Sequence, residues 1–308
     1  MPLLVDPFDK LTEDLKSTFR PQREWVDKRG LLLVTAHFLS GAGAGTWLFA
    51  WLLGLNWGLA IGWVLVAGGA VAHLLFLGKP LRFWRIVRMP QTSWISRGLL
   101  SISLFLLTAL LYLLPGYFPG LPWNGDSGLG QALLVISLIA TAGIFVYKGF
   151  VYAVAKAIPF WNTPLLPPLY IAYGLRGGLA VLFVASAIQG RAMDLESAKA
   201  LELWMVLSTA ILLLFYMGVM AGAGVTTAES IRHLVRGPAS LPFYLGAVAV
   251  GLIIPVAFGI VSYFSPLTPG AMSAVALASL VGDFYIKYCV ARAGIYLPVT
   301  VRFPARAH

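Results

Sequence analysis

Residues 31–78, LLLVTAHFLSGAGAGTWLFAWLLGLNWGLAIGWVLVAGGAVAHLLFLG, decide the fold, because no Asp, Glu, Lys or Arg interrupts them. A single helix of this length would measure roughly 70 Å at about 1.5 Å per residue, about twice the hydrocarbon core of a bilayer. The segment therefore predicts two membrane-spanning helices that fold back on each other near Asn56-Trp57-Gly58.

The remaining apolar stretches divide in the same way. Residues 98–147 carry one charge, Asp126, and are split by the proline- and glycine-rich segment 115–126, which cannot continue a helix. Further spans are predicted at about 165–190 and 201–224, and a charge-free run from 237 to 282 is broken at 265–270. Because no stretch alternates as a barrel strand would, the sequence predicts an all-α membrane protein with eight helices and both termini on one side.

The composition excludes whole classes of protein. Of 308 residues, 59% are hydrophobic and only 11% charged, too few charges to cover a soluble enzyme. The net charge of +10 lies in short clusters between apolar runs, which indicates a lipid bilayer and not nucleic acid as the partner. Cys289 is the only cysteine, so the chain alone forms no disulfide, thiolate zinc site or iron–sulfur cluster.

Basic residues concentrate on the side of the termini. All but three of the 22 lysines and arginines are assigned to that side, Lys148 and Lys156 among them; the exceptions are Arg176, Arg191 and Lys199. The positive-inside rule then places the termini in the cytoplasm. A docking surface for an acidic partner would show the same bias. Residues 1–30 are predicted to form a polar tail and not a cleaved signal peptide.

Three polar side chains are predicted to lie at one depth. His37 and His73 each sit about 8 to 10 Å from the termini side at about 1.5 Å per residue, and Tyr147 falls in a comparable band. Two imidazoles and a phenol can hydrogen-bond the two carbonyls of a quinone and exchange protons with it. Two alternatives stay open: these residues form interhelical hydrogen bonds, or the histidines ligate one b-type haem.

Charges inside predicted spans suggest a second feature. Arg176 falls within the fifth helix, and Asp283 and Lys287 lie one turn apart on the eighth, where they can pair. Arg176 and Asp283 could belong to a proton or ion path, to a structural bridge, or to a secondary transporter. The small residues at 41–45 and 221–224 are predicted to let helices touch closely.

Four segments together resemble the NrfD/PsrC family, the membrane subunits of polysulfide, tetrathionate, nitrite and related reductases. They are residues 37–45 (HFLSGAGAG), 77–85 (LGKPLRFWR), 92–98 (TSWISRG) and 157–167 (AIPFWNTPLLP). The resemblance covers most of the sequence up to the fifth helix.

The resemblance implies two four-helix bundles, residues 31–156 and 157–308, and a menaquinone or ubiquinone site in the first bundle without haem. His37 and Tyr147 correspond to the family's quinone-contacting residues, and His73 and Gly78 are assigned to the same site.

The resemblance also implies partners and a location. It predicts that the protein is a quinone-reactive anchor in a prokaryotic cytoplasmic membrane. This anchor exchanges electrons with a four-cluster iron–sulfur subunit, which in turn contacts a molybdopterin catalytic subunit. A basic rim for docking and charge stabilisation is assigned to Lys79, Arg82, Arg85 and Arg97.

Overall fold

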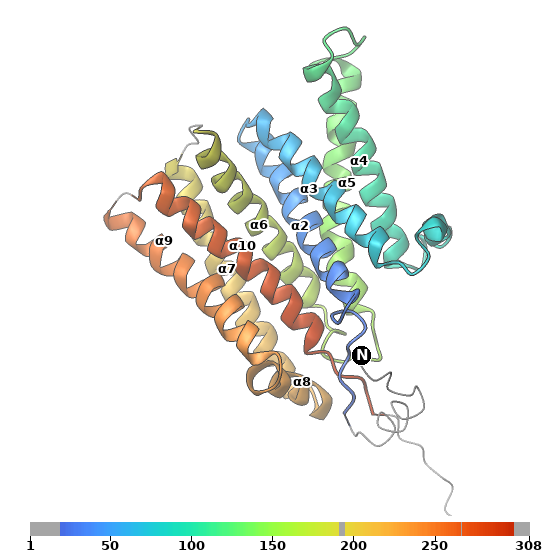
Figure 1. Cartoon of the computed structure of the whole chain (residues 1–308), viewed down its shortest axis with the longest axis vertical. Helices are drawn as coiled ribbons and strands as arrows, with labels where there is room; N and C mark the ends of the chain where they lie inside the picture. The colour runs from blue at the N-terminus through green and yellow to red at the C-terminus, as the bar shows by residue number, and fades with distance from the viewer. Residues whose placement is uncertain (1–18, 191–194, 266, 299–308) are drawn as a thin grey trace, which may run out of the picture.

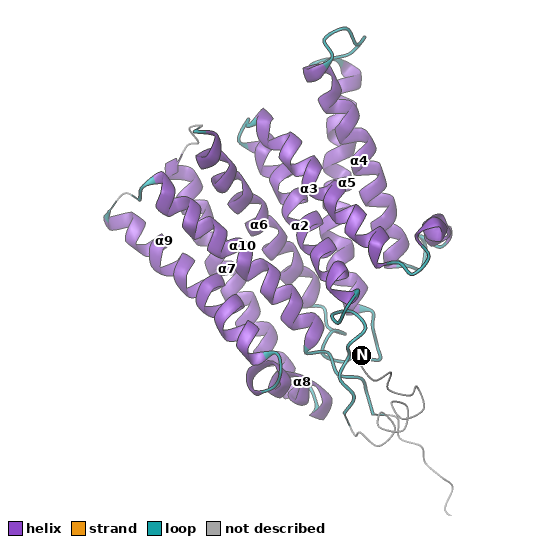
Figure 2. Ribbon diagram, in the orientation of Figure 1, coloured by secondary structure: helices purple, strands orange, loops and turns teal. Residues whose placement is uncertain are grey.

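The computed structural model describes residues 19–190, 195–265 and 267–298, which are almost wholly helical (Figure 2). Within these ranges, eight helical segments are long and apolar enough to cross a membrane, which confirms the predicted all-α membrane fold. They are α2 (Gly30–Leu52), α3 (Asn56–Phe76), α4 (Trp94–Tyr117), α5 (Gly128–Ala153), α6 (Leu166–Gln189), α7 (Leu195–Gly222), the continuous pair η2 (Pro242–Ile253) and α9 (Ile254–Phe264), and α10 (Pro269–Arg292). Two shorter helices, η1 (Pro80–Arg88) and α8 (Val225–Arg236), lie between spans.

The first fold-back occurs slightly earlier than predicted. The turn between α2 and α3 is residues 53–55, and Asn56-Trp57-Gly58 already form the first turn of α3. Gly54 has a φ of 66°, a left-handed conformation that glycine adopts without steric cost. The glycine, and not the asparagine, therefore marks the reversal.

Both described ends of the polypeptide lie on the same side, as predicted (Figure 1). The Gln22 amide donates to the Gly294 carbonyl at 2.8 Å, and the Tyr296 amide donates to the Arg20 carbonyl at 2.9 Å. Several residues used in the charge argument lie outside the described ranges: Lys10, Lys16, Arg191, Arg302, Arg306 and the side chain of Lys199.

The helices form a layered bundle in which α2 and α6 are central (Figure 1). The outer helices expose large apolar side chains, such as Val64 (61%), Leu107 (58%) and Leu214 (70%). Such exposure suits contact with lipid, because lipid tails need no polar covering.

Glycines allow the central helices to approach closely. A Cβ on Gly43 would lie 2.7 Å from the Val66 amide nitrogen of α3, and one on Gly178 of α6 would collide with the Gly45 backbone. Close packing at 41–45 is thus confirmed. At 221–224 the prediction is wrong: these residues are exposed, and no neighbour among the described residues lies within 4 Å of a Cβ on Gly222.

Because α2 packs on both α3 and α6, the division into two bundles at residue 156 stays a prediction.

Candidate functional site

The two intramembrane histidines meet, as the depth argument predicted. His37 comes from α2 and His73 from α3, and their ring centroids are 5.4 Å apart in an edge-to-face arrangement. The antiparallel pairing of these helices brings the start of α2 level with the end of α3. His37 is 2% exposed, so its imidazole is enclosed by neighbouring helices.

Two tyrosines of α5 complete the group. The Tyr147 hydroxyl lies 3.5 Å from Nε2 of His73, and the Tyr147 ring centroid is 6.2 Å from that of His37. Sequence reasoning missed Tyr152, whose hydroxyl lies 3.3 Å from Nδ1 of His37. Tyr152 lies near the end of α5, the helix that also carries Tyr147, and this position was the feature of the sequence that could have identified it. We call His37, His73, Tyr147 and Tyr152 the histidine–tyrosine cluster.

Hydrogen-bond partners define what the cluster can donate and accept. Nδ1 of His73 lies 2.9 Å from the Gly69 carbonyl, which can only accept, so this nitrogen carries a proton. In the neutral ring, Nε2 then accepts from the Tyr147 hydroxyl, at the outer limit of a hydrogen bond. Nε2 of His37 has no hydrogen-bond partner among the described residues. The cluster therefore keeps polar capacity for a bound molecule.

The cluster's geometry bears on the haem alternative. The His37 and His73 imidazoles are in edge contact, and Nε2 of His73 faces the Tyr147 hydroxyl. Axial ligands of one haem would instead approach its iron from opposite sides of the macrocycle. The arrangement thus favours hydrogen bonding, either among the helices or to a shared ligand.

Gly98 of α4 holds the Tyr147 ring in place. A Cβ at this position would lie 2.6 Å from Cε2 of Tyr147, so only glycine leaves room for the ring. The residues before Gly98 anchor the start of α4: Trp94 stacks on Phe150 of α5 with centroids 4.3 Å apart. The segment 92–98 therefore helps to position Tyr147.

Lys148, which the charge pattern assigned to the side of the termini, has a buried side chain. It lies inside α5 and is 1% exposed, and its Nζ has no hydrogen-bond partner in the described part of the protein. Lys148 lies in the last two turns of α5, near the link to α6 as the charge pattern predicted, but its side chain is buried among the helices. Lys156 is exposed, as expected.

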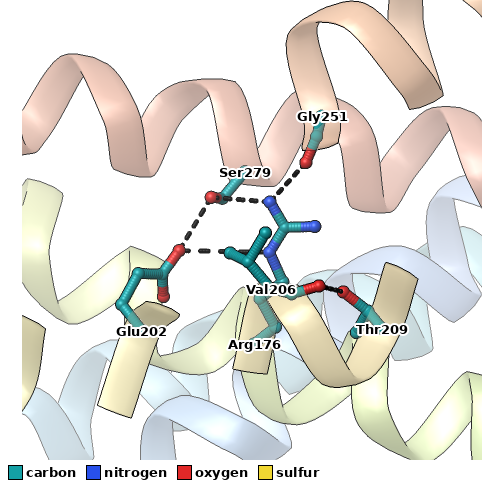
Figure 3. A network of polar contacts seen from close by, with 6 residues as sticks. All are labelled: Arg176, Glu202, Val206, Thr209, Gly251 and Ser279. Atoms are coloured by element: carbon teal, nitrogen blue, oxygen red, sulfur yellow. Dashed lines mark hydrogen bonds and ion pairs between the residues drawn. The ribbon is translucent and has the colours of Figure 1, made fainter. Parts of the chain in front are cut away.

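Arg176 forms a buried network with partners that the sequence did not indicate (Figure 3). Its Nε lies 3.9 Å from Oε1 of Glu202 on α7, and its Nη2 donates to the Ser279 hydroxyl of α10 at 2.8 Å. The same Nη2 donates to the Gly251 carbonyl, which belongs to the π-helical segment η2. The predicted link from Arg176 to Asp283 is therefore wrong, because α7 supplies the carboxylate.

Asp283 and Lys287 pair with each other on α10, as their one-turn spacing predicted. Lys287 Nζ donates to Oδ1 of Asp283, and both side chains are buried. Oδ2 of Asp283 has no partner among the described residues. Tyr173 of α6 stands between this pair and Arg176: its ring centroid is 5.8 Å from Lys287 Nζ and 6.0 Å from the Arg176 guanidinium carbon.

The predicted basic rim divides into exposed and anchored residues. Lys79, Arg82 and Arg85 are exposed in or beside η1, and the Arg85 guanidinium lies over the Trp84 ring at 5.5 Å. Arg97 is half-buried and donates to the Pro90 and Gln91 carbonyls at 2.8 and 2.7 Å, so it mainly ties the preceding loop to α4. Gly78 is exposed after α3 and is not brought into the cluster.

Comparison with known proteins gives consistent matches. A family model described as "Polysulphide reductase, NrfD" matches residues 28–299. The sequence is 23% identical over 290 residues to one of the chains of polysulfide reductase from Wolinella succinogenes, with 83% of this protein and 91% of that one covered. It is 26% identical over 248 residues to "Protein NrfD" of Escherichia coli, with 73% and 78% covered. A shorter match of 27% over 142 residues, 43% of each protein, is to one of the subunits of sulfite dehydrogenase from Allochromatium vinosum.

Proposed function

Because the chain belongs to the polysulphide reductase NrfD family, we propose that it is the quinone-reactive membrane anchor of an oxidoreductase complex. The observation that carries this function is the histidine–tyrosine cluster, in which groups that can hydrogen-bond quinone oxygens gather from α2, α3 and α5. Two relatives are named as single components of polysulfide reductase and of sulfite dehydrogenase, which supports a role as one subunit among several.

The cluster's free polar capacity fits a quinone. A bound menaquinone or ubiquinone supplies two-electron, two-proton redox chemistry. With quinone bound, the Tyr147 hydroxyl would turn its single proton from Nε2 of His73 to one quinone oxygen, and Nε2 of His37 would donate to the other. Nε2 of His73 would take or return the Tyr147 proton, because it already faces that hydroxyl at 3.5 Å.

The partners we propose are a four-cluster iron–sulfur subunit and, beyond it, a molybdopterin catalytic subunit. The exposed Lys79, Arg82 and Arg85 form a positive surface on the side of the described chain ends, close in sequence to the end of α3 that carries His73. Arg97 supports the loop beside this surface. The excess of basic residues supports a position for this face in the cytoplasm of a prokaryotic cell.

Arg176, Asp283 and Lys287 are proposed to belong to a proton path through the second half of the protein. A series of contacts runs from Glu202 through Ser279 and Arg176 to the neighbourhood of Tyr173, and from there to Lys287. Arg176 would position its neighbours in this series and keep its own proton. Glu202 lies near the start of α7, on the side away from the described chain ends. The series therefore leads from that side toward the level of the cluster.

The direct test is purification of this protein from its native membrane in mild detergent, with mass spectrometry, an absorption spectrum and quinone extraction. Co-purification with iron–sulfur and molybdopterin subunits and bound quinone is the expected result. A colourless protein that purifies alone and transports a solute would instead support the transporter hypothesis.

The fit of Tyr147 against Gly98 leads to a prediction for Gly98→Val. The added side chain must displace the Tyr147 ring, and misplacing a catalytic group by about 1 Å can cost roughly 100-fold in rate. We expect quinone-linked turnover to fall by about that factor, while the partner subunits' activity with an artificial dye is unchanged. Gly116→Val, on the same helix, is the control, because no described residue lies within 4 Å of a Cβ at this position. Equal rates for both variants would contradict the positioning role of Gly98.

The basic surface is tested by Arg82→Glu combined with Arg85→Glu. Reversing two exposed charges should weaken association with the acidic partner and make the remaining association less sensitive to salt. The measurement is the yield of the iron–sulfur subunit in a pull-down between about 50 and 300 mM salt, well within the range where screening changes. Arg236→Glu, an exposed charge reversal on α8, is the matched control. Unchanged recovery in the double variant would move the docking surface elsewhere.

A further inference from the structure

Lys148 is a buried lysine beside the histidine–tyrosine cluster. Its side chain is 1% exposed in the middle of the bundle, and no acceptor for its Nζ occurs within the described residues. A charged group inside a membrane protein is costly unless it is paired or hydrated, so such groups are usually functional. The nearby residues Tyr147 and Tyr152 on α5 both belong to the histidine–tyrosine cluster.

Nζ of Lys148 points to the place where α2 and α6 touch. A Cβ on Gly41 of α2 would lie 3.2 Å from this nitrogen and 3.7 Å from the Cα of Gly174 on α6. Gly41 follows His37 by one helical turn and so shares its face of α2. The ammonium group therefore lies beside the cluster, at the boundary between the two halves of the protein.

A second unpartnered atom reaches the same helix contact from the other half. Oδ2 of Asp283 would lie 2.6 Å from a Cβ on Gly177, one turn beyond Gly174 on α6. That Cβ would also be 3.4 Å from the Cβ of Ala42, the neighbour of Gly41 on α2. Oδ2 has no hydrogen-bond partner in the described ranges. An unpaired ammonium and an unpaired carboxylate oxygen thus face adjacent positions of one glycine-rich contact.

The charged groups around this contact come from every helix packed on it. His37 on α2, Lys148 on α5 and Lys287 on α10 are close enough for their charges to interact, as are Lys287 and Arg176 on α6. His73 on α3 interacts with Lys148 in the same way. Lys148 is therefore close enough to interact electrostatically with both the cluster and the Asp283–Lys287 pair, as His37 also is.

We propose that Lys148 transfers protons between the histidine–tyrosine cluster and the Asp283–Lys287 pair, across the α2–α6 contact. This role rests on the proposed quinone function and extends it. In quinone reduction, an N–H bond of Lys148 breaks as its proton moves to the cluster, and the neutral amine takes a proton from the Asp283–Lys287 side. Two such transfers accompany two electrons from the iron–sulfur partner; quinol oxidation runs in reverse.

The Lys148→Arg variant distinguishes two roles of Lys148: transferring protons, or only supplying a positive charge. Lys148→Arg keeps the charge, but a guanidinium does not give up its proton in proteins. Lys148→Met removes both charge and proton, and Lys148→Gln keeps a polar group. If Lys148 transfers protons, all three variants lose turnover alike; if it only supplies charge, the arginine variant stays active.

The experiment uses the complete complex reconstituted in vesicles that contain a pH-sensitive dye. We expect each Lys148 variant to lower quinone-linked turnover and the associated rate of proton uptake or release by about 100-fold, the scale of a lost proton-transfer group. The quinone content of the purified complex and its dye-linked activity should stay at the wild-type level. Lys156→Met, which makes the same change at an exposed lysine, should leave every measurement unaffected.

Asp283→Asn provides the second half of the test. It should reproduce the Lys148→Met phenotype, and the double variant should be no slower than either single variant, because both residues act in one pathway. Near-wild-type turnover in Lys148→Arg, or multiplied defects in the double variant, would overturn the proposal. If the wild-type complex itself holds no quinone, the proposed function fails first, and this outcome is distinct from a Lys148 defect in a quinone-loaded complex.

Discussion

Tyr147→Phe is expected to reduce quinone-linked turnover of the native complex by about 100-fold or more, the usual scale for a lost acid–base group. The substitution removes only the hydroxyl, 3.5 Å from Nε2 of His73, and leaves the ring that packs on Gly98. Packing should therefore persist, and quinone reduction or oxidation should be the step that suffers. The dye-linked activity of the partner subunits should remain, since it bypasses this protein.

His37→Ala should give a similar loss. It removes the one cluster nitrogen, Nε2, that lacks a partner among the described residues, together with the acceptor for Tyr152. Quinone titration of the purified complex should show weakened binding in addition to slow turnover, because His37 is proposed to hold a quinone oxygen.

Tyr216→Phe is the matched control for the loss of a buried tyrosine hydroxyl. Tyr216 is fully buried on α7 and donates to the Phe160 carbonyl at 2.6 Å, far in sequence from the cluster. The complex with Tyr216→Phe should have the same ratio of quinone-linked to dye-linked activity as the wild-type complex. Survival of quinone-linked turnover in both cluster variants would show that the quinone binds elsewhere.

Arg176→Leu is expected to cause the largest loss of stability, about 3–5 kcal/mol, the scale observed when one partner of a buried ion pair is removed. The substitution leaves the buried Glu202, which is 6% exposed, without its arginine partner, and leaves the Gly251 carbonyl without its hydrogen-bond donor. The midpoint of thermal unfolding in detergent, followed by tryptophan fluorescence, measures the effect.

The double variant Arg176→Leu with Glu202→Leu tests the cause. Removing both partners leaves no stranded carboxylate, so the double variant should be more stable than Arg176→Leu alone. If the two losses simply add, the 3.9 Å approach of Arg176 to Glu202 contributes little, and the bonds to Ser279 and Gly251 account for the effect.

The network around Arg176 also includes an irregular span. The π-helical segment η2 changes the backbone hydrogen-bond ladder, and π-helical turns often occur at functional sites. Here the Arg176 guanidinium bonds the Gly251 carbonyl from a different helix. A Cβ on Gly251 would collide with Gly282 of α10, so this irregular segment is also tightly packed.

The sequence alone determined the number of spans, the shared side of the two described chain ends (Figure 1), and the common level of His37, His73 and Tyr147. Runs such as 31–78 are too long for one crossing and too apolar to leave the bilayer, so each must fold back. Depth follows from a constant rise of about 1.5 Å per residue, which is why His37, His73 and Tyr147 could be placed at one level before their contacts were known.

Only the tertiary structure decided which helix faces meet. Depth does not define how far each helix is rotated about its axis, and neighbouring helices differ little in hydrophobicity around their circumference. Glycine contacts between α2, α3 and α6 set those rotations. In the folded protein Tyr152 faces His37, Arg176 pairs with Glu202 and not with Asp283, and Lys148 is enclosed, because side-chain packing and not depth selects the partner.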